Sequence, residues 1–215
     1  MIQAVLFDLD GTLTNTIDDI ATAMNRALRL HGLPGWETKE YCYLVGNGAK
    51  ILAQRAVRDR QDLADAVQAE YQAYYEKHTQ VKTQPYDGIP ELLHDLKATG
   101  TRLAVATGKP TVFSEQILEH FGLLQYFDIV SGIPLDREPP DKCEVILHAL
   151  YEMGISDRTG CVMVGDRSHD AIGAKMARID FIGVLYGYGS REELEVEGSG
   201  ILAESVAALR SLLLN

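Results

Sequence analysis

The sequence predicts an α/β fold, with a doubly wound, mainly parallel, Rossmann-like sheet core and a helical domain inserted after the first strand. Three observations predict it. Short continuous apolar runs, typical of strands that are buried on both faces, recur along the 215 residues. Helical patterns separate most of these runs. One long stretch near the N-terminus carries helical patterns alone.

The predicted strands are apolar runs of five or six residues. The first, over residues 2–7, has almost no polar alternation and ends at Asp8. Helices cover both faces of a parallel sheet, so its strands are apolar on both sides. Three similar runs cover residues 102–107, 161–165 and 181–185, and a weaker fifth covers 127–131.

The predicted helices alternate with these strands. They cover residues 90–99, 111–121, 142–153 and 168–177. Glycine follows the first three of them directly, and glycine favours the left-handed conformation in which helices commonly end. Strand–helix alternation of this kind predicts a doubly wound sheet.

Residues 14–82 interrupt this alternation. Their helical patterns cover residues 17–28, 49–57 and 63–76, and we find no convincing strand among them. The strand–helix pattern resumes after Pro85. We therefore predict that residues 1–13 and 83–215 form the α/β core, and that residues 14–82, called the insert below, form a helical domain.

The composition excludes several classes of partner. The 20 basic and 31 acidic residues give a formal net charge of −11, which disfavours nucleic acid because phosphate backbones require clustered Lys and Arg. No apolar run approaches the roughly 18 residues of a membrane span, and the N-terminus shows no signal peptide. Three widely spaced cysteines fit reduced thiols. We expect a cytoplasmic monomer or homodimer.

Two acidic residues follow the first predicted strand. Asp8 and Asp10 are two residues apart, so their side chains point the same way if the chain stays extended. They fall at the carboxyl end of a central strand, where open parallel sheets bind ligands. Like charges this close need a cation, and Mg²⁺ prefers hard oxygen ligands. The bare pattern fits a turn with a capping Asp equally well.

A second acidic pair follows the strand at residues 161–165. Asp166 and Asp170 are four residues apart, which is about one helical turn, and they could complete a magnesium site. Taken alone, the pattern also fits acidic residues at a helix N-terminus. We expect the neighbouring Arg167 and His169 to be spacers that face solvent.

Two further strand ends carry groups suited to phosphate. The Thr107 hydroxyl and the backbone N–H of Gly108 precede a helix and could cradle a phosphate, although a simple helix start explains them too. Lys142 opens a helix against the helix dipole, so helix stability does not explain it, whereas a phosphoryl oxygen would. An ordinary surface lysine is the alternative.

All four signals follow predicted strands, so the fold would bring them to one edge of the sheet. In this order they resemble the motifs of the haloacid dehalogenase superfamily of phosphohydrolases. These motifs are DLDGT at residues 8–12, Thr107 in ATGKP, Lys142, and GDRSHD at residues 165–170. The resemblance covers essentially the whole chain, with the insert as the superfamily's cap domain.

Within the superfamily the sequence looks most like the phosphoglycolate phosphatase group. The segments that carry this likeness are LFDLDGTL at residues 6–13, HGLP at 31–34, VGNGA at 45–49, PYDGIPELL at 85–93, LAVATGKP at 103–110 and VLYGYGS at 184–190. As a cap loop, VGNGA would reach the substrate, with Asn47 or Lys50 as the contact. By itself its G-x-G pattern is a weak nucleotide signal.

The resemblance implies a magnesium-dependent phosphatase that hydrolyses a small, phosphoglycolate-like monoester through an aspartyl-phosphate intermediate. Asp8 would attack phosphorus, and Asp10 would protonate the leaving oxygen and then deprotonate the attacking water. Thr107, Gly108 and Lys142 would hold the phosphoryl oxygens. Mg²⁺ would be held by Asp8, the backbone carbonyl of Asp10, Asp166 and, in support, Asp170.

Two alternatives stay open at this point. A sugar phosphomutase, or a phosphatase of another small substrate such as a nucleotide, would share the same core residues. A phospho-accepting receiver domain of signalling proteins also uses acidic residues, a Thr, a Lys and Mg²⁺. Receivers place the acceptor Asp on a later strand, however, and are about half this length.

Overall fold

The structure is a computed structural model that describes residues 2–78, 81–134, 140–197 and 200–214. In these residues the main sheet has six parallel strands in the order β5-β4-β1-β6-β7-β8. They are β1 (Ala4–Phe7), β4 (Arg102–Pro110), β5 (Ile129–Ile133), β6 (Cys161–Gly165), β7 (Asp180–Val184) and β8 (Leu202–Ala203). The predicted fold class is confirmed.

The direction of winding reverses at β1. The chain adds β4 and then β5 on one side of β1, and afterwards β6, β7 and β8 on the other side. In open α/β sheets, ligands bind at such a reversal, outside the carboxyl ends of the strands. The turn after β1 and the ends of β4 and β6 therefore define the expected site.

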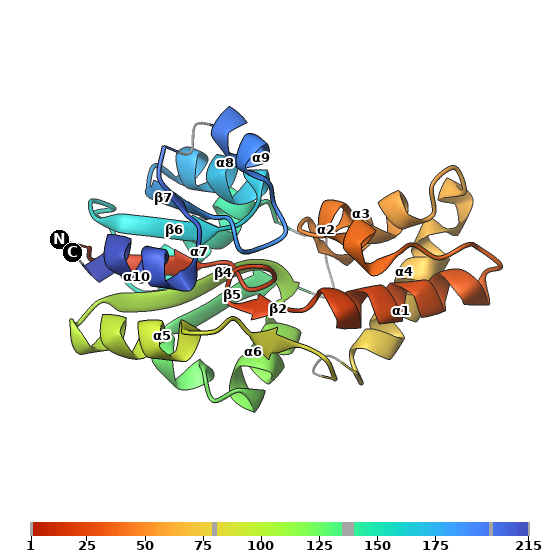
Figure 1. Ribbon diagram of the computed structural model, residues 1–215, viewed down its shortest axis with the longest axis horizontal. Helices are drawn as coiled ribbons and strands as arrows, with labels where there is room; N and C mark the ends of the chain where they lie inside the picture. The colour runs from red at the N-terminus through yellow and green to blue at the C-terminus, as the bar shows by residue number, and fades with distance from the viewer. Residues whose placement is uncertain (1, 79–80, 135–139, 198–199, 215) are drawn as a thin grey trace.

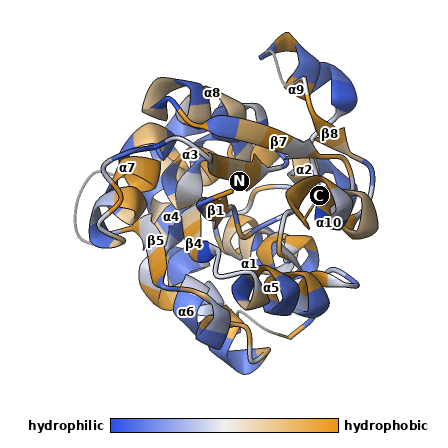
Figure 2. Cartoon of the chain, turned by 90° about the vertical axis from the view of Figure 1, so that its left-hand side faces the viewer, coloured by the Kyte–Doolittle hydropathy of each residue, from blue (hydrophilic) through white to orange (hydrophobic). Residues whose placement is uncertain are grey.

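Helices cover both faces of the sheet (Figure 2). On one face lie α5 (Ile89–Ala98), α6 (Thr111–His120) and α10 (Val206–Leu214), and on the other lie α7 (Lys142–Glu152) and α8 (Ser168–Ala177). The short α9 (Arg191–Val196) contacts α8. Along β1, Val5 and Phe7 pack into the first apolar layer, and Ala4 and Leu6 into the second. This two-sided burial explains the unbroken apolar runs.

The helices of the insert lie apart from the sheet (Figure 1). They are α1 (Ile17–Leu30), α2 (Tyr41–Leu44), α3 (Gly48–Ala56) and α4 (Ala64–Tyr75). They pack around an apolar cluster of their own, to which α1 contributes Ile20, Met24 and Leu28 at helical spacing. We retain the division at residues 14–82 as a proposal, and residues 79–80 of the insert lie outside the described part.

The expectation that the insert contains no strand is wrong. The two-residue strand β2 (Thr14–Asn15) pairs antiparallel with β3 (Gln84–Pro85), at the point where the chain leaves and re-enters the core. A strand this short shows no alternation in the sequence. Its hydrogen-bonding partner follows the far end of the insert, about 70 residues along the chain, which local patterns do not reveal. Several strand boundaries also shift: β4 runs on to Pro110, β5 covers Ile129–Ile133, and β1 begins at Ala4.

Asp19 fastens the returning chain to α1. Its carboxylate is buried and accepts hydrogen bonds from the backbone N–H groups of Lys82, at 3.0 Å, and Thr83, at 2.8 Å. The Thr83 hydroxyl donates to the same carboxylate at 2.8 Å. Both ends of the insert are thus held together beside the β2–β3 ribbon.

Replacing this carboxylate should loosen the base of the insert. We expect Asp19→Ala to lower the free energy of unfolding by about 1–3 kcal/mol, because it leaves buried N–H groups without an acceptor. Thermal denaturation measures the loss. The matched control is Asp18→Ala on the exposed side of the same helical turn. Equal melting temperatures for the two variants would contradict this role.

Candidate active site

Asp8 stands directly after β1 at the edge of the sheet. Its backbone N–H donates to the Val164 carbonyl of β6 at 2.9 Å, so the sheet still holds the residue in place. The side chain is only 5% exposed. Burial raises its pKa to about 6, although the ammonium of Lys142 opposes the shift. A carboxylate held this way is ionised at neutral pH and poorly solvated, which suits a nucleophile.

Lys142 binds two of the predicted acidic residues. Its Nζ donates to Asp8 Oδ1 at 3.0 Å and to the Ala106 carbonyl at 2.8 Å, and it lies 2.7 Å from Asp170 Oδ1. Burial disfavours the ammonium, but the carboxylates of Asp170 and Asp8 raise the pKa of Lys142 above its ordinary value. A Cβ on Gly173 would lie 2.6 Å from the lysine side chain. The alternative of a surface lysine is therefore wrong.

Asp166 and Asp170 are both fully buried, in different electrostatic surroundings. Burial and the charges of Asp170 and Asp8 raise the pKa of Asp166, whose carboxylate accepts from the Tyr188 backbone N–H at 2.7 Å. Burial alone would also raise the pKa of Asp170, but Lys142 holds it below its ordinary value. Lys142 thus pairs with two of the three buried carboxylates, Asp8 and Asp170, which leaves negative charge in excess.

This excess of buried negative charge fits a divalent cation. Ligand atoms of Asp8, Asp170 and His169 lie within 4.8 Å of one another. Carboxylate oxygens are the ligands that Mg²⁺ prefers, and His169 is neutral because burial lowers its pKa to about 4. The loop at Gly11, with φ of +86°, passes so close to Asp166 that a Cβ there would collide with the carboxylate. The residues present fit a magnesium ion.

Asp10 lies in the same cleft as Asp8, held by two neighbours. One carboxylate oxygen accepts from the Thr16 hydroxyl at 2.7 Å, and the other lies 3.0 Å from Lys109 Nζ. Lys109 is buried and also donates to the Tyr75 hydroxyl at 2.9 Å. No role was predicted for Lys109 from the sequence. The signal was present, because side chains two residues apart on an extended strand, such as Thr107 and Lys109, share a face.

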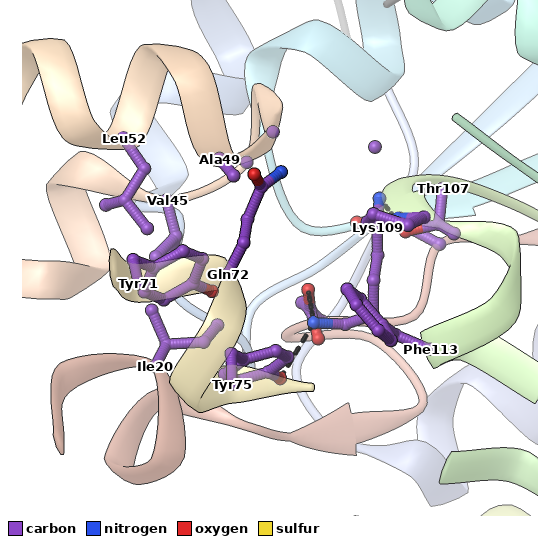
Figure 3. A pocket seen from close by; sticks show the side chains of 16 residues that line it. Ile20, Val45, Ala49, Leu52, Tyr71, Gln72, Tyr75, Thr107, Lys109 and Phe113 are labelled. Carbon is purple, nitrogen blue, oxygen red and sulfur yellow. Dashed lines mark hydrogen bonds and ion pairs between the residues drawn. The ribbon is translucent and has the colours of Figure 1, made fainter. Parts of the chain in front are cut away.

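Thr107 lies on the opposite side of the cleft from the insert (Figure 3), and Gly108 follows it in β4. The buried Thr107 hydroxyl accepts from the Lys109 backbone N–H at 3.2 Å. A Cβ on Gly108 would lie 2.8 Å from the Gly46 carbonyl, so the insert approaches the core here through backbone alone. The structure therefore brings Asp8, Asp10, Thr107 and Gly108 together in one cleft.

Asn47 lies at the other side of this contact. It precedes α3 and lines a neighbouring cleft with Lys142, Gly108 and His169, not the cleft that contains Asp8 and Asp10. Its contact with substrate stays a prediction.

The expectation that Arg167 and His169 face solvent is wrong. Arg167 donates to the backbone carbonyls of Cys42, at 2.9 Å, and Val45, at 2.6 Å, both in the insert. His169 is largely buried, and a Cβ on Gly46 would lie 2.5 Å from its ring. The insert covers this edge of the sheet, which the spacing of residues along the sequence does not show.

Comparison with known proteins agrees with the geometry. Residues 5–184 match the model of the family described as haloacid dehalogenase-like hydrolase. The chain belongs to this family.

No helix in the described residues has the length and apolar character needed to cross a membrane.

Relatives and solved structures of this hydrolase family cover almost the whole chain. A phosphoglycolate phosphatase of Colwellia psychrerythraea is 32% identical over 91% of this chain and 90% of its own length. The tyrosine-protein kinase PtkA of Mycobacterium tuberculosis is 36% identical over 98% of this chain and 72% of its own. The crystal structure of a predicted phosphatase from Clostridium acetobutylicum has a TM-score of 0.92 and 36% identity, covering 100% of this chain and 99% of that one.

These findings confirm the resemblance to the superfamily and to its phosphoglycolate phosphatase group. Together with the phosphatase names of several relatives, they make this hydrolase a phosphoric monoester hydrolase. The receiver-domain alternative is therefore set aside.

The two buried acids, Asp166 and Asp170, should respond oppositely to neutralisation. Without metal at pH 7, we expect Asp166→Asn to raise the melting temperature by about 2–4 °C, or roughly 1 kcal/mol, because it removes an unfavourable buried charge. We expect Asp170→Asn to cost about 3–5 kcal/mol, because it breaks a buried ion pair with Lys142.

Thermal denaturation with and without Mg²⁺ measures both effects. A carboxyl whose pKa is raised in the folded protein destabilises the fold at any pH above its ordinary pKa, because the unfolded chain gives up that proton more readily than the folded protein does. The gain in Asp166→Asn should therefore vanish as the pH falls towards about 4, the ordinary pKa of Asp, because below it the carboxyl is protonated in both states. Magnesium should stabilise the wild type more than this variant. Shifts of the same sign in both variants would contradict the assignment.

Proposed function

We propose that this hydrolase cleaves a small phosphate monoester, with Mg²⁺, through an aspartyl-phosphate formed on Asp8. The observation that carries the proposal is the placement of two carboxylates in one cleft. Asp8 is buried and hydrogen-bonded to Lys142, while Asp10 is turned towards Thr16 and Lys109. Two acids in such different surroundings suit two different roles.

In the first step, Asp8 attacks phosphorus and the bond from phosphorus to the leaving oxygen breaks. Asp10 gives its proton to that oxygen. In the second step, Asp10 takes a proton from a water molecule, which attacks the aspartyl-phosphate and releases phosphate and the Asp8 carboxylate. Thr16 and Lys109 fix the direction in which the Asp10 carboxylate points.

The remaining groups neutralise charge on the phosphoryl oxygens. The Lys142 ammonium, the Thr107 hydroxyl and the Gly108 N–H lie around the same strand ends as Asp8. A magnesium ion would be held by Asp8, the Asp10 carbonyl, Asp166 and Asp170, and would supply further positive charge for the transferring group. Catalysis of this kind consists mainly of positioning and electrostatic stabilisation.

The nature of the small substrate is also part of the proposal. The substrate is small because the loop of the insert reaches the core at Gly108 and covers the cleft. A phosphoglycolate-like monoester is the substrate that the group likeness suggests. A phosphomutase differs in passing the phosphoryl group to a second hydroxyl, so phosphate release in the absence of any acceptor sugar separates the two reactions.

Free thiols at Cys42, Cys143 and Cys161 support a cytoplasmic location.

Asp8→Asn tests the nucleophile. We expect less than about 1% of the wild-type kcat, equivalent to a barrier at least about 2.7 kcal/mol higher, because an amide does not form the acyl phosphate. The measurement is phosphate release, together with acid trapping of phospho-enzyme, which should appear in the wild type alone. An unchanged circular dichroism spectrum controls for folding. Trapped phospho-enzyme in the variant would place the nucleophile elsewhere.

Asp10→Asn tests the acid–base role. An alkyl oxide leaves poorly without a proton, whereas an aryl oxide leaves with little help, so the variant should lose far more rate on alkyl than on aryl phosphates. Because the attacking water also loses its base, aryl phosphates should give a burst of phenol followed by slow turnover. Rapid-quench kinetics with both substrates measures this. An equal loss on both, without a burst, would assign Asp10 a structural role.

A further inference from the structure

The wall of the active-site cleft that faces Asp8 and Asp10 is apolar and aromatic. Figure 3 shows its side chains on the insert, opposite Thr107 and Lys109 of the core. Those of the insert are Ile20, Val45, Ala49, Leu52, Tyr71 and Tyr75, and Phe113 of α6 joins them from the core. Gln72 supplies an uncharged amide beside them. Because Asp8 and Asp10 line the same cleft, a leaving group that points into this cleft from a phosphorus at Asp8 meets this wall.

The aromatic members of the wall support one another. The rings of Tyr71 and Tyr75 stack with centroids 5.3 Å apart and an interplanar angle of 21°. Tyr75 meets Phe113 edge-on, with centroids 6.1 Å apart. Burial raises the pKa of both tyrosines well above the ordinary value, so their hydroxyl groups stay neutral. The wall is a packed aromatic surface without charge.

The positive charge in this cleft is already paired with a carboxylate. Among the described residues that line it, Lys109 is the cationic side chain, and its ammonium lies 3.0 Å from the Asp10 carboxylate. The same ammonium donates to the Tyr75 hydroxyl and lies 4.6 Å from the centre of that ring. A carboxylate on the leaving group would therefore compete with Asp10 for one lysine.

These surroundings select against a charged leaving group. A carboxylate that is moved from water to an apolar wall loses its hydration, and without a cation of its own it does not regain that free energy. An apolar or aromatic group gains from the same transfer, and a ring gains further from contact with other rings. This difference in the free energy of transfer favours uncharged leaving groups over glycolate, which carries a carboxylate.

We propose that the leaving group of the preferred substrate is uncharged and packs an apolar or aromatic face against Leu52, Tyr71, Tyr75 and Phe113. This proposal rests on the proposed function, because it takes the phosphoryl group to lie at Asp8. It narrows the class of substrate, because a phosphoglycolate-like compound would be a poor substrate.

The first test compares two alkyl phosphates. Benzyl phosphate carries an uncharged aromatic leaving group and 2-phosphoglycolate a carboxylate. We expect kcat/KM to be at least tenfold higher for benzyl phosphate. An equal value, or a preference for 2-phosphoglycolate, would overturn the proposal and leave the phosphatase function intact.

Binding gives a readout that does not depend on turnover. The phosphonates 2-phenylethylphosphonate and 3-phosphonopropionate replace the ester oxygen of these two substrates by a methylene group. Calorimetry should show at least tenfold tighter binding of 2-phenylethylphosphonate. If this holds and neither ester is hydrolysed, the proposed function fails while the apolar subsite stands. Equal or weaker binding of 2-phenylethylphosphonate would overturn the subsite.

A variant tests the wall itself. Leu52→Gln should weaken binding of 2-phenylethylphosphonate about tenfold and change that of 3-phosphonopropionate less than threefold. The ratio of the two affinities is independent of the fraction of folded protein. The matched control is Leu30→Gln, at an exposed position of α1 outside the cleft, which should leave the ratio unchanged. An unchanged ratio in Leu52→Gln would show that this wall does not contact the leaving group.

Discussion

The ammonium of Lys142, held between Asp8 and Asp170, is the interaction on which the rest of the site depends. Its three participants come from the start of α7, the end of β1 and the first turn of α8. Each charge is buried and would be costly alone. The single lysine leaves the carboxylates in excess. Burial, and after it the charge of the neighbouring carboxylates, raises the pKa of Asp8 and Asp166, and the excess of negative charge creates the demand for a cation.

A second ion pair links this chemistry to the insert. Asp10 is paired with Lys109, and Lys109 donates to Tyr75, which belongs to the apolar cluster of the insert. Arg167 makes a parallel connection, from a position next to Asp166 to two carbonyl groups of the insert. The same residues that place the acids therefore place the wall facing the leaving group. The two acids lie in the core, whereas most of the side chains of that wall belong to the insert.

Much of the fold and part of the site could be predicted because they depend on local patterns. A strand buried on both faces must be apolar throughout, so β1, β4 and β6 were visible as unbroken runs. Polar residues directly after such runs must lie at one edge of a parallel sheet, which located Asp8, Asp10, Thr107 and Asp166. Lys142 was identified because a lysine at a helix start opposes the dipole and needs another explanation.

What the sequence by itself determined is the order of strands and helices and the set of groups at the strand ends, since these follow from burial and chain direction. Only the tertiary structure decided which groups are partners. The β2–β3 ribbon, the Arg167 contacts and the burial of His169 all join segments far apart in the chain. The alternation of side chains along a strand places Lys109 on the same face as Thr107. Its pairing with Asp10 and Tyr75, however, required the insert to fold back over the sheet. Contacts of this kind depend on distances across the fold, which residue spacing does not encode.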